Sequence, residues 1–266
     1  MTGAPATVRP VRILVTNDDG VEAPGLRALA RALVEAGHDV TVVAPDGEHS
    51  GAGASIGRLH RSGPIDRVTV EWPELPGVPV HALATTPAAA VYAGGLGSFG
   101  PRPELIASGV NRGLNTGHLA LHSGTVGAAL TGLVLGLAGL AVSLGWGEDE
   151  HWSTAAALAA AAVPAAAALE GRILSLNVPN VPFDELRGVR AAQPAPYAEW
   201  WHAETPPGEL RLVYDGHVRE FDAHTDVGLV QAGYAAVTEL SGIGGAPAVD
   251  AAALVQEHWP AAPAPR

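Results

Sequence analysis

The sequence predicts an α/β fold of the Rossmann-like, doubly wound type, with a mostly parallel sheet and a C-terminal β-hairpin or arm extension. The residues from Arg12 to Thr16 form a short aliphatic run typical of a buried strand, and those from His38 to Ala44 form a second one. Between them, leucines and alanines recur at helical spacing. Such a βαβ unit implies parallel strands and right-handed crossovers. The alternation continues to about residue 180, as in an open doubly wound sheet.

The remaining elements follow from apolar runs bounded by glycine and proline. Pro24 suits the first turn of the first helix, and Gly37 closes that helix. The later strands are expected at residues 67–72, 78–83, 104–108, 140–144 and 172–177. The later helices are expected at residues 87–93, 125–137 and 151–170, the last of which Pro164 can kink or split. The stretches 46–57 and 109–124 are interpreted as loops.

The chain divides into three parts. Residues 1–10 are expected to be a loose tail, and residues 11–185 the Rossmann-like domain that carries the candidate site. Residues 186–266 are expected to form an antiparallel extension and a C-terminal arm, part of the same domain and involved in self-association. Within them, Asp215-Gly216 between two apolar runs (210–214 and 217–221) is a hairpin signal. A strand at residues 235–240 and a helix at residues 249–258 are expected to follow.

Composition narrows the classes of function. The 266 residues are 47% hydrophobic and 16% charged, which argues for a packed core. The net charge of −12 disfavours a duplex nucleic acid as partner, although a bound metal ion can still attract a phosphorylated small molecule. Cysteine is absent, so disulfides are excluded. No secretion signal or membrane-spanning run is apparent, and a cytoplasmic protein is expected.

Two adjacent carboxylates stand where the first strand ends. Asp18 and Asp19 lie in the sequence Asn-Asp-Asp-Gly, and ligands of parallel sheets bind at the carboxyl ends of the strands. Neighbouring carboxylates repel each other unless a cation or solvent compensates, and Mg²⁺ and Mn²⁺ prefer such hard oxygen ligands. A solvated turn that caps the following helix explains the same residues equally well.

Further polar loops follow the second strand and the strand at residues 104–108. Ser50 lies in the first of these loops, and Asn111 and Asn115 lie in a glycine-rich second loop. Ser123, Gly124 and Thr125 then open a helix, whose free N–H groups would suit a phosphate. Ordinary capping of that helix by serine or threonine is the alternative.

Four of these segments together resemble the SurE family, whose members are metal-dependent 5′/3′-nucleotidases. The resemblance covers residues 11–145 and is patchy to residue 180. The motifs that carry it are NDDG with APG, APD with SGA, SGVN with GLNTG, and SGTVGAAL, and LNVP and Thr225-Asp226 are also similar to family positions.

The resemblance implies a site and a chemistry. It makes Asp18, Asp19, Ser50 and Asn111 the ligands of one divalent cation per subunit, Mg²⁺ or Mn²⁺, with the two aspartates also catalytic. It places Asn115 and the run Ser123, Gly124 and Thr125 on the phosphate-binding stretch. It further implies hydrolysis of nucleoside monophosphates by a dimer or tetramer whose C-terminal arm is exchanged between subunits.

This chain departs from the family pattern around the expected substrate pocket. Gly47-Glu48-His49 replaces basic residues before Ser50, and Ala54 and Ala89 replace an asparagine and an aspartate. His122 replaces a tyrosine beside the phosphate stretch and is a candidate for proton transfer. Two alternatives therefore stay open: a phosphatase for another phosphorylated metabolite, and a catalytically silent relative that binds nucleotide or metal.

Overall fold

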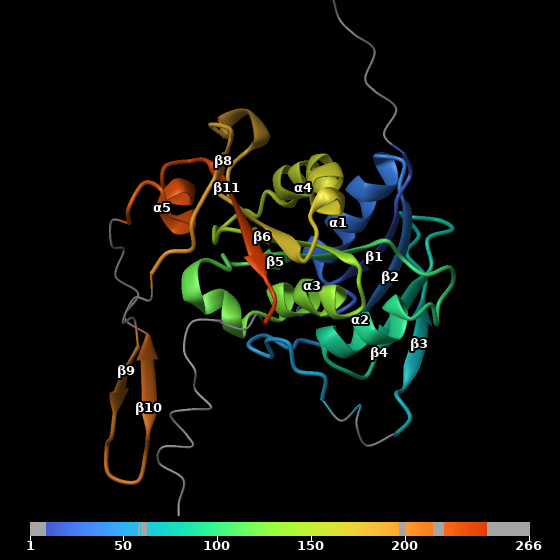
Figure 1. Cartoon of the computed structure of the whole chain (residues 1–266). Coiled ribbons are helices and arrows are strands. Elements are labelled where there is room, and N and C mark those ends of the chain that lie inside the picture. Colours follow the sequence, from blue (N-terminus) through green and yellow to red (C-terminus); the bar gives the residue numbers. More distant parts are fainter. Residues whose placement is uncertain (1–8, 58, 60–62, 197–200, 215–220, 244–266) are drawn as a thin grey trace, which may run out of the picture.

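The computed structural model describes residues 9–57, 59, 63–196, 201–214 and 221–243, and within them a nine-stranded sheet lies between two layers of helices (Figure 1). Six neighbouring strands, β4, β2, β1, β5, β6 and β7, run parallel to one another. At one side of the sheet β3 pairs antiparallel with β4, and at the other β11 pairs antiparallel with β7 and parallel with β8. The Rossmann-like α/β class is confirmed. The order across the sheet is β3 (Arg67–Val70), β4 (Val80–Leu83), β2 (Asp39–Pro45), β1 (Arg12–Thr16), β5 (Leu105–Arg112), β6 (Ala138–Leu144), β7 (Arg172–Val178), β11 (Ala235–Ser241) and β8 (Val189–Ala191).

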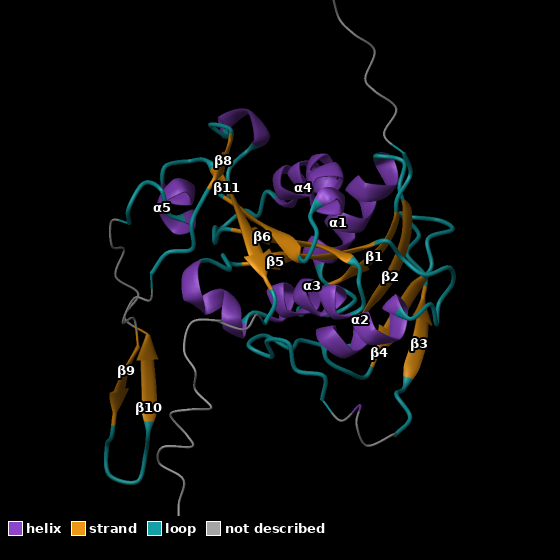
Figure 2. Ribbon diagram, in the orientation of Figure 1, coloured by secondary structure: helices purple, strands orange, loops and turns teal. Residues whose placement is uncertain are grey.

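The helices cover both faces of the sheet (Figure 2). Helices α1 (Pro24–Glu35) and α4 (Trp152–Ala168) pack together on one face, and α2 (Pro87–Gly95) and α3 (Gly124–Val134) pack on the other. Successive side chains of a strand point to opposite faces, so Val15 of β1 joins the core under α1 while Leu14 joins the core under α2. Burial on both faces explains why the central strands are continuous aliphatic runs.

The crossover from β6 to β7 has the opposite hand to its neighbour. The β5–α3–β6 and β6–α4–β7 units advance in the same direction across the sheet, yet α3 and α4 lie on opposite faces. Both hands therefore occur, and the expectation of right-handed crossovers is wrong for one of the two units. Alanines such as Ala155 and Ala159 let α4 pack against α1, which brings the start of α4 beside the start of α1.

Several element boundaries differ from those expected. β5 continues to Arg112 through a register shift after Ser108, so residues 109–112 are strand rather than loop. A 3₁₀ helix, η2 (Gly117–His122), occupies part of the same expected loop. α3 ends at Val134 because Gly136, with φ of +69°, turns the chain into β6. Pro164 lies inside α4 without ending it.

The C-terminal extension was only partly anticipated. The expected strand at residues 235–240 is confirmed as β11, whereas α5 (Asp226–Gln231) and β8 were not foreseen. The short 3₁₀ helix η3 (Phe183–Glu185), which comes just before the extension, was not foreseen either. β10 (Arg211–Tyr214) pairs with β9 (Trp201–Glu204), which precedes it in the chain. The Asp215-Gly216 turn and the helix at residues 249–258 lie outside the described residues.

The close approach of α3 to the sheet requires glycine at position 139, and this requirement can be tested. A Cβ on Gly139 would lie 2.4 Å from Cγ2 of Ile173 and 2.9 Å from the carbonyl oxygen of Ala129. We expect Gly139→Ala to lower the free energy of unfolding by about 1–3 kcal/mol in chemical denaturation. Gly242→Ala is the control, because its Cβ would meet nothing within 4 Å. Equal stability of the two variants would contradict this packing.

Candidate metal and phosphate site

The strand order places a crevice between the ends of β1 and β5. The chain leaves β1 toward β2 on one side and later returns to β5 on the other, so the direction of winding reverses between these two strands. Ligands of open α/β sheets bind outside the carboxyl ends of the strands at such a switch point. Asp18 and Asp19 follow β1, and Asn111 lies near the end of β5. The topology therefore places these residues at adjacent strand ends.

Asp18 is held at the N-terminus of α3. Its side chain is only 3% exposed and accepts a 2.5 Å hydrogen bond from the hydroxyl of Thr125, together with backbone N–H groups of Gly124 and Thr125. A Cβ on Gly124 would lie 2.6 Å from the Asp18 side chain, so glycine is needed for this approach. Burial raises the pKa of Asp18 even though these donors oppose the shift.

Asp19 is surrounded by more negative than positive charge. Burial, followed by the charges of Asp18 and Glu48, raises its pKa from 3.8 to about 6. The backbone N–H and the charge of Arg112 act in the opposite direction. The Arg112 guanidinium is already paired with Glu150, at 2.5 Å between Nη2 and Oε1. A bound cation would relieve this excess of negative charge.

The loop that carries Ser50 lies against this pair. The backbone N–H of His49 donates to the carbonyl oxygen of Asp18 at 2.6 Å, and Gly47 approaches Gly20 closely. Ser50 is exposed, and its hydroxyl donates to the Glu48 carboxylate at 3.0 Å. The structure therefore brings the Ser50 loop to the aspartates, while directing the serine hydroxyl toward Glu48.

The two asparagines of the next loop are fixed by hydrogen bonds. Asn111 donates from Nδ2 to the carbonyl oxygen of Gly113 at 2.7 Å, so its amide oxygen is the atom suited to a cation. Asn115 donates from Nδ2 to Ser143 Oγ at 2.8 Å, and its backbone N–H donates to Asn177 Oδ1 at 2.8 Å. The amide of Asn177 donates in return to the carbonyl oxygen of Asn115. Asn115 is therefore held in place through both its side chain and its main chain.

Sequence reasoning missed this support for Asn115. Asn177 and Ser143 are almost fully buried at the ends of β7 and β6, and only the LNVP motif around Asn177 gave a signal. Asp226 of α5 adds a third contact, since its carboxylate accepts from the backbone N–H groups of Gly117 at 2.7 Å and Ala195 at 3.0 Å. The C-terminal extension thus fixes the far end of the Asn115 loop.

The remaining candidates for phosphate binding have structural partners. Ser123 caps α3 by accepting from the backbone N–H of Val126, so the capping alternative is confirmed for this residue. His122 exposes its side chain, and its carbonyl oxygen accepts from the backbone N–H of Gly53. The hydroxyl of Thr125 donates to the Asp18 carboxylate, as described above. The polar run at the start of α3 therefore organises the carboxylate and the neighbouring loop.

The oxygen donors fit a hard divalent cation. Two carboxylates, a hydroxyl and an amide are the ligand types that Mg²⁺ and Mn²⁺ prefer. The buried side-chain oxygen of Asn17, next to Asp18, has no hydrogen-bond partner in the described part of the chain. Across the same residues no three His, Cys, Asp or Glu side chains are placed to hold one metal ion together, so neutral oxygens have to complete any metal site.

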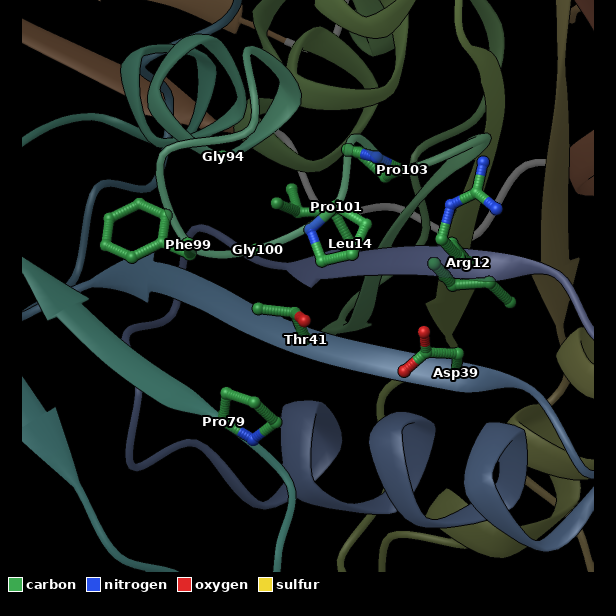
Figure 3. A pocket seen from close by; sticks show the side chains of 11 residues that line it. Arg12, Leu14, Asp39, Thr41, Pro79, Gly94, Phe99, Gly100, Pro101 and Pro103 are labelled. Atoms are coloured by element: carbon green, nitrogen blue, oxygen red, sulfur yellow. The ribbon is translucent and has the colours of Figure 1, made fainter.

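A separate cavity of about 140 Å³ lies at the opposite ends of the strands, away from the candidate site (Figure 3). Arg12, Asp39 and Thr41, at the starts of β1 and β2, face Phe99 and the prolines that follow it there. Since Asp18 follows the other end of β1, this cavity cannot receive a ligand of the candidate site.

Comparison with known proteins agrees with this geometry. The family model described as survival protein SurE matches residues 13–199, which is more than half of the chain. The chain belongs to the SurE family. Figure 1 shows the SurE core that carries these loops. Within the described ranges, no helix is long and apolar enough to cross a membrane.

Individual SurE proteins resemble this chain over most of its length. The 5′/3′-nucleotidase SurE of Serratia proteamaculans (strain 568) is 37% identical over 238 residues, which cover 86% of this chain and 90% of the relative. The 5′/3′-nucleotidase SurE of Escherichia coli O1:K1 / APEC is 41% identical over 186 residues and 69% of each chain. The crystal structure of SurE from Aquifex aeolicus superposes with a TM-score of 0.72 at 26% identity, covering 93% of this chain and 98% of the other.

The excess of negative charge at the aspartates predicts that the free energy of unfolding of the metal-free protein depends on pH. Because the folded-state pKa of Asp19 lies above 3.8, the folded protein binds this proton more tightly than the unfolded chain does. Asp19 therefore destabilises the metal-free fold progressively as the pH rises from about 4 through 6, and fully above that range. A pKa raised from 3.8 to about 6 corresponds to about 3 kcal/mol, which the partial solvent exposure of Asp19 reduces.

We accordingly expect Asp19→Asn to raise the free energy of unfolding at pH 7.5 in EDTA by about 1–2 kcal/mol. The gain should vanish near pH 4, as measured by chemical denaturation across that range. The control, Asp39→Asn, changes an exposed acid at the opposite edge of the sheet and should alter stability by less than about 0.5 kcal/mol. A destabilised Asp19→Asn protein at pH 7.5 would contradict the charge excess.

Proposed function

We propose that this chain is a divalent-metal-dependent phosphomonoesterase that hydrolyses nucleoside 5′- and 3′-monophosphates to nucleoside and phosphate. The observation that carries the proposal is the partly buried Asp18-Asp19 pair at the switch point, where both pKa values are raised. Relatives that share 36–41% of their residues with the chain are named 5′/3′-nucleotidase or 5′-nucleotidase SurE, which supports the same activity.

The metal in this proposal is one Mg²⁺ or Mn²⁺ per subunit, with Asp18, Asp19, Ser50 and Asn111 as its ligands. Such a cation supplies Lewis acidity toward a phosphoryl oxygen. The Ser50 hydroxyl, which donates to Glu48, has to turn toward the aspartates to serve as a ligand. The Thr125 hydroxyl fixes Asp18 through a hydrogen bond to Oδ1, and Oδ2 is the oxygen that we assign to the cation.

The residues of the chain would share the work of positioning and proton transfer. The N-terminus of α3, at Ser123 to Thr125, places a positive dipole end beside the site, which favours a phosphate there. Asn115 would contact a phosphate oxygen from the loop that Asn177 and Asp226 hold in place. A carboxylate beside the cation can orient the attacking water and accept its proton, which is the role we give Asp19. His122 is the candidate to protonate the leaving oxygen.

Self-association is part of the proposal. The β9–β10 hairpin extends from the main body (Figure 1) and exposes Leu210 and Leu212 at 68% and 67%. Exposed leucines on a projecting hairpin favour an exchanged arm in a dimer or tetramer. A cytoplasmic location stays a prediction of the sequence.

A metal and substrate panel separates this function from its alternatives. We expect hydrolysis of nucleoside monophosphates to stop in EDTA and to return with Mn²⁺ or Mg²⁺. Faster turnover of another class of phosphomonoester would instead indicate a different metabolite as substrate. Tight nucleotide binding without turnover, measured by calorimetry, would indicate a catalytically silent relative.

The role of Asp19 has its own test. We expect Asp19→Asn to lower kcat by at least about 100-fold in saturating Mn²⁺, because it removes both a ligand and the proposed base. The matched control is Asp39→Asn, which should keep the activity of the unmodified protein. Full activity in Asp19→Asn would rule out this mechanism.

A further inference from the structure

A second cavity adjoins the candidate site on the side of α1 and α4. Its volume is about 290 Å³, near the lower end of the range for small-molecule pockets. Asp19 forms one wall, the first turn of α1 at Pro24 and Gly25 forms another, and the residues around the start of α4 form the rest. The side chains of Arg112, Glu150 and Trp152 complete the lining.

Trp152 is fixed beside this cavity by the packing of α4 on α1. A Cβ on Gly25 would lie 2.9 Å from Cζ3 of Trp152 and 2.1 Å from the carbonyl oxygen of Val110. The indole ring therefore rests against the backbone of α1, at a position that only glycine permits. This arrangement depends on the opposite-handed crossover, which brings the start of α4 to the face covered by α1. The result is a supported aromatic surface next to Asp19.

The charges that line the cavity disfavour a second anionic group. Arg112 is the basic residue of the lining, and its guanidinium pairs with Glu150 and lies 5.1 Å from the centroid of Trp146. Once Arg112 pairs with Glu150 and a cation offsets the charges of Asp18 and Asp19, the lining keeps no free positive charge for a second phosphate. Such a cavity suits an uncharged group with a flat ring more than it suits a second phosphate.

We propose that this cavity receives the nucleoside part of the substrate, with the base stacked on Trp152. The inference rests on the proposed function and names the surface that would hold the base of its nucleoside leaving group. The scissile phosphate lies at Asp18, Asp19 and the start of α3, and the nucleoside extends over Asp19 toward α4. Nucleosides that carry a second phosphate are poorer ligands of the same site.

Another cavity at this edge of the sheet fits the role less well. It measures about 590 Å³ and is lined by the loop around His49 and by Thr85 and Thr86. None of Asp18, Asp19 and Asn111 belongs to its lining, whereas Asp19 itself forms part of the cavity beside Trp152. A leaving group is bonded to the phosphate, so the cavity that shares a wall with the aspartates is the one it can enter.

The direct test is equilibrium binding of adenosine, which has the ring but no phosphate. Calorimetry on the full chain, with and without Mn²⁺, should detect binding that weakens about 10-fold or more in Trp152→Ala and much less in Trp152→Phe. Phe183→Ala is the matched control, because Phe183 is an exposed aromatic residue outside the cavity lining, and this variant should bind adenosine normally. No adenosine binding, or equal binding by all four proteins, would overturn the assignment.

A second variant addresses the charge and does not alter the packing of Trp152. Glu150→Gln frees Arg112, so the affinity for adenosine 3′,5′-bisphosphate relative to adenosine should rise about 2- to 5-fold. An unchanged ratio would overturn the proposed role of the ion pair. Binding does not require turnover: adenosine binding that depends on Trp152 in a protein with no Mn²⁺-dependent hydrolysis would refute the proposed function and keep the binding site.

Discussion

The site depends on the burial of two neighbouring carboxylates at one edge of the sheet. Asp18 and Asp19 repel each other, and burial raises the free energy of their charged forms. Helix α3 stabilises only the first of them, through Thr125 and the backbone at Gly124. The charge that remains on Asp19 favours a cation at this edge, which is the basis of the proposed metal site. A protein without such a function would gain stability by replacing it.

The fold supplies that arrangement through long-range contacts. Reversal of the winding between β1 and β5 brings Asp19 next to the backbone N–H of Arg112. The ends of β6 and β7 contribute the buried hydroxyl and amide that fix Asn115, and the C-terminal extension contributes Asp226. The candidate site is thus held by elements from most of the chain.

Local patterns in the sequence were enough to predict the parallel core, whereas Ser50 and Asn111 became candidate ligands only through the resemblance to the SurE family. Aliphatic runs mark β1 and β2, and the charged pair that follows β1 marks the site. Patterns of this kind carry no information about which partner a polar group finds. The support of Asn115 by Asn177, the use of Thr125 by Asp18 and the hand of the β6–β7 crossover all depend on tertiary packing. The extension of β5 past Ser108 was missed because its glycine suggested a loop.

The most direct test of this account is the position of the cation itself. A crystal grown with Mn²⁺ and measured for anomalous scattering should show one strong peak per subunit, at about 2 Å from oxygens of both Asp18 and Asp19. Oxygens of Ser50 and Asn111, or waters that they hold, should complete its coordination. A well-ordered peak elsewhere in the chain, with none at these aspartates, would contradict the account.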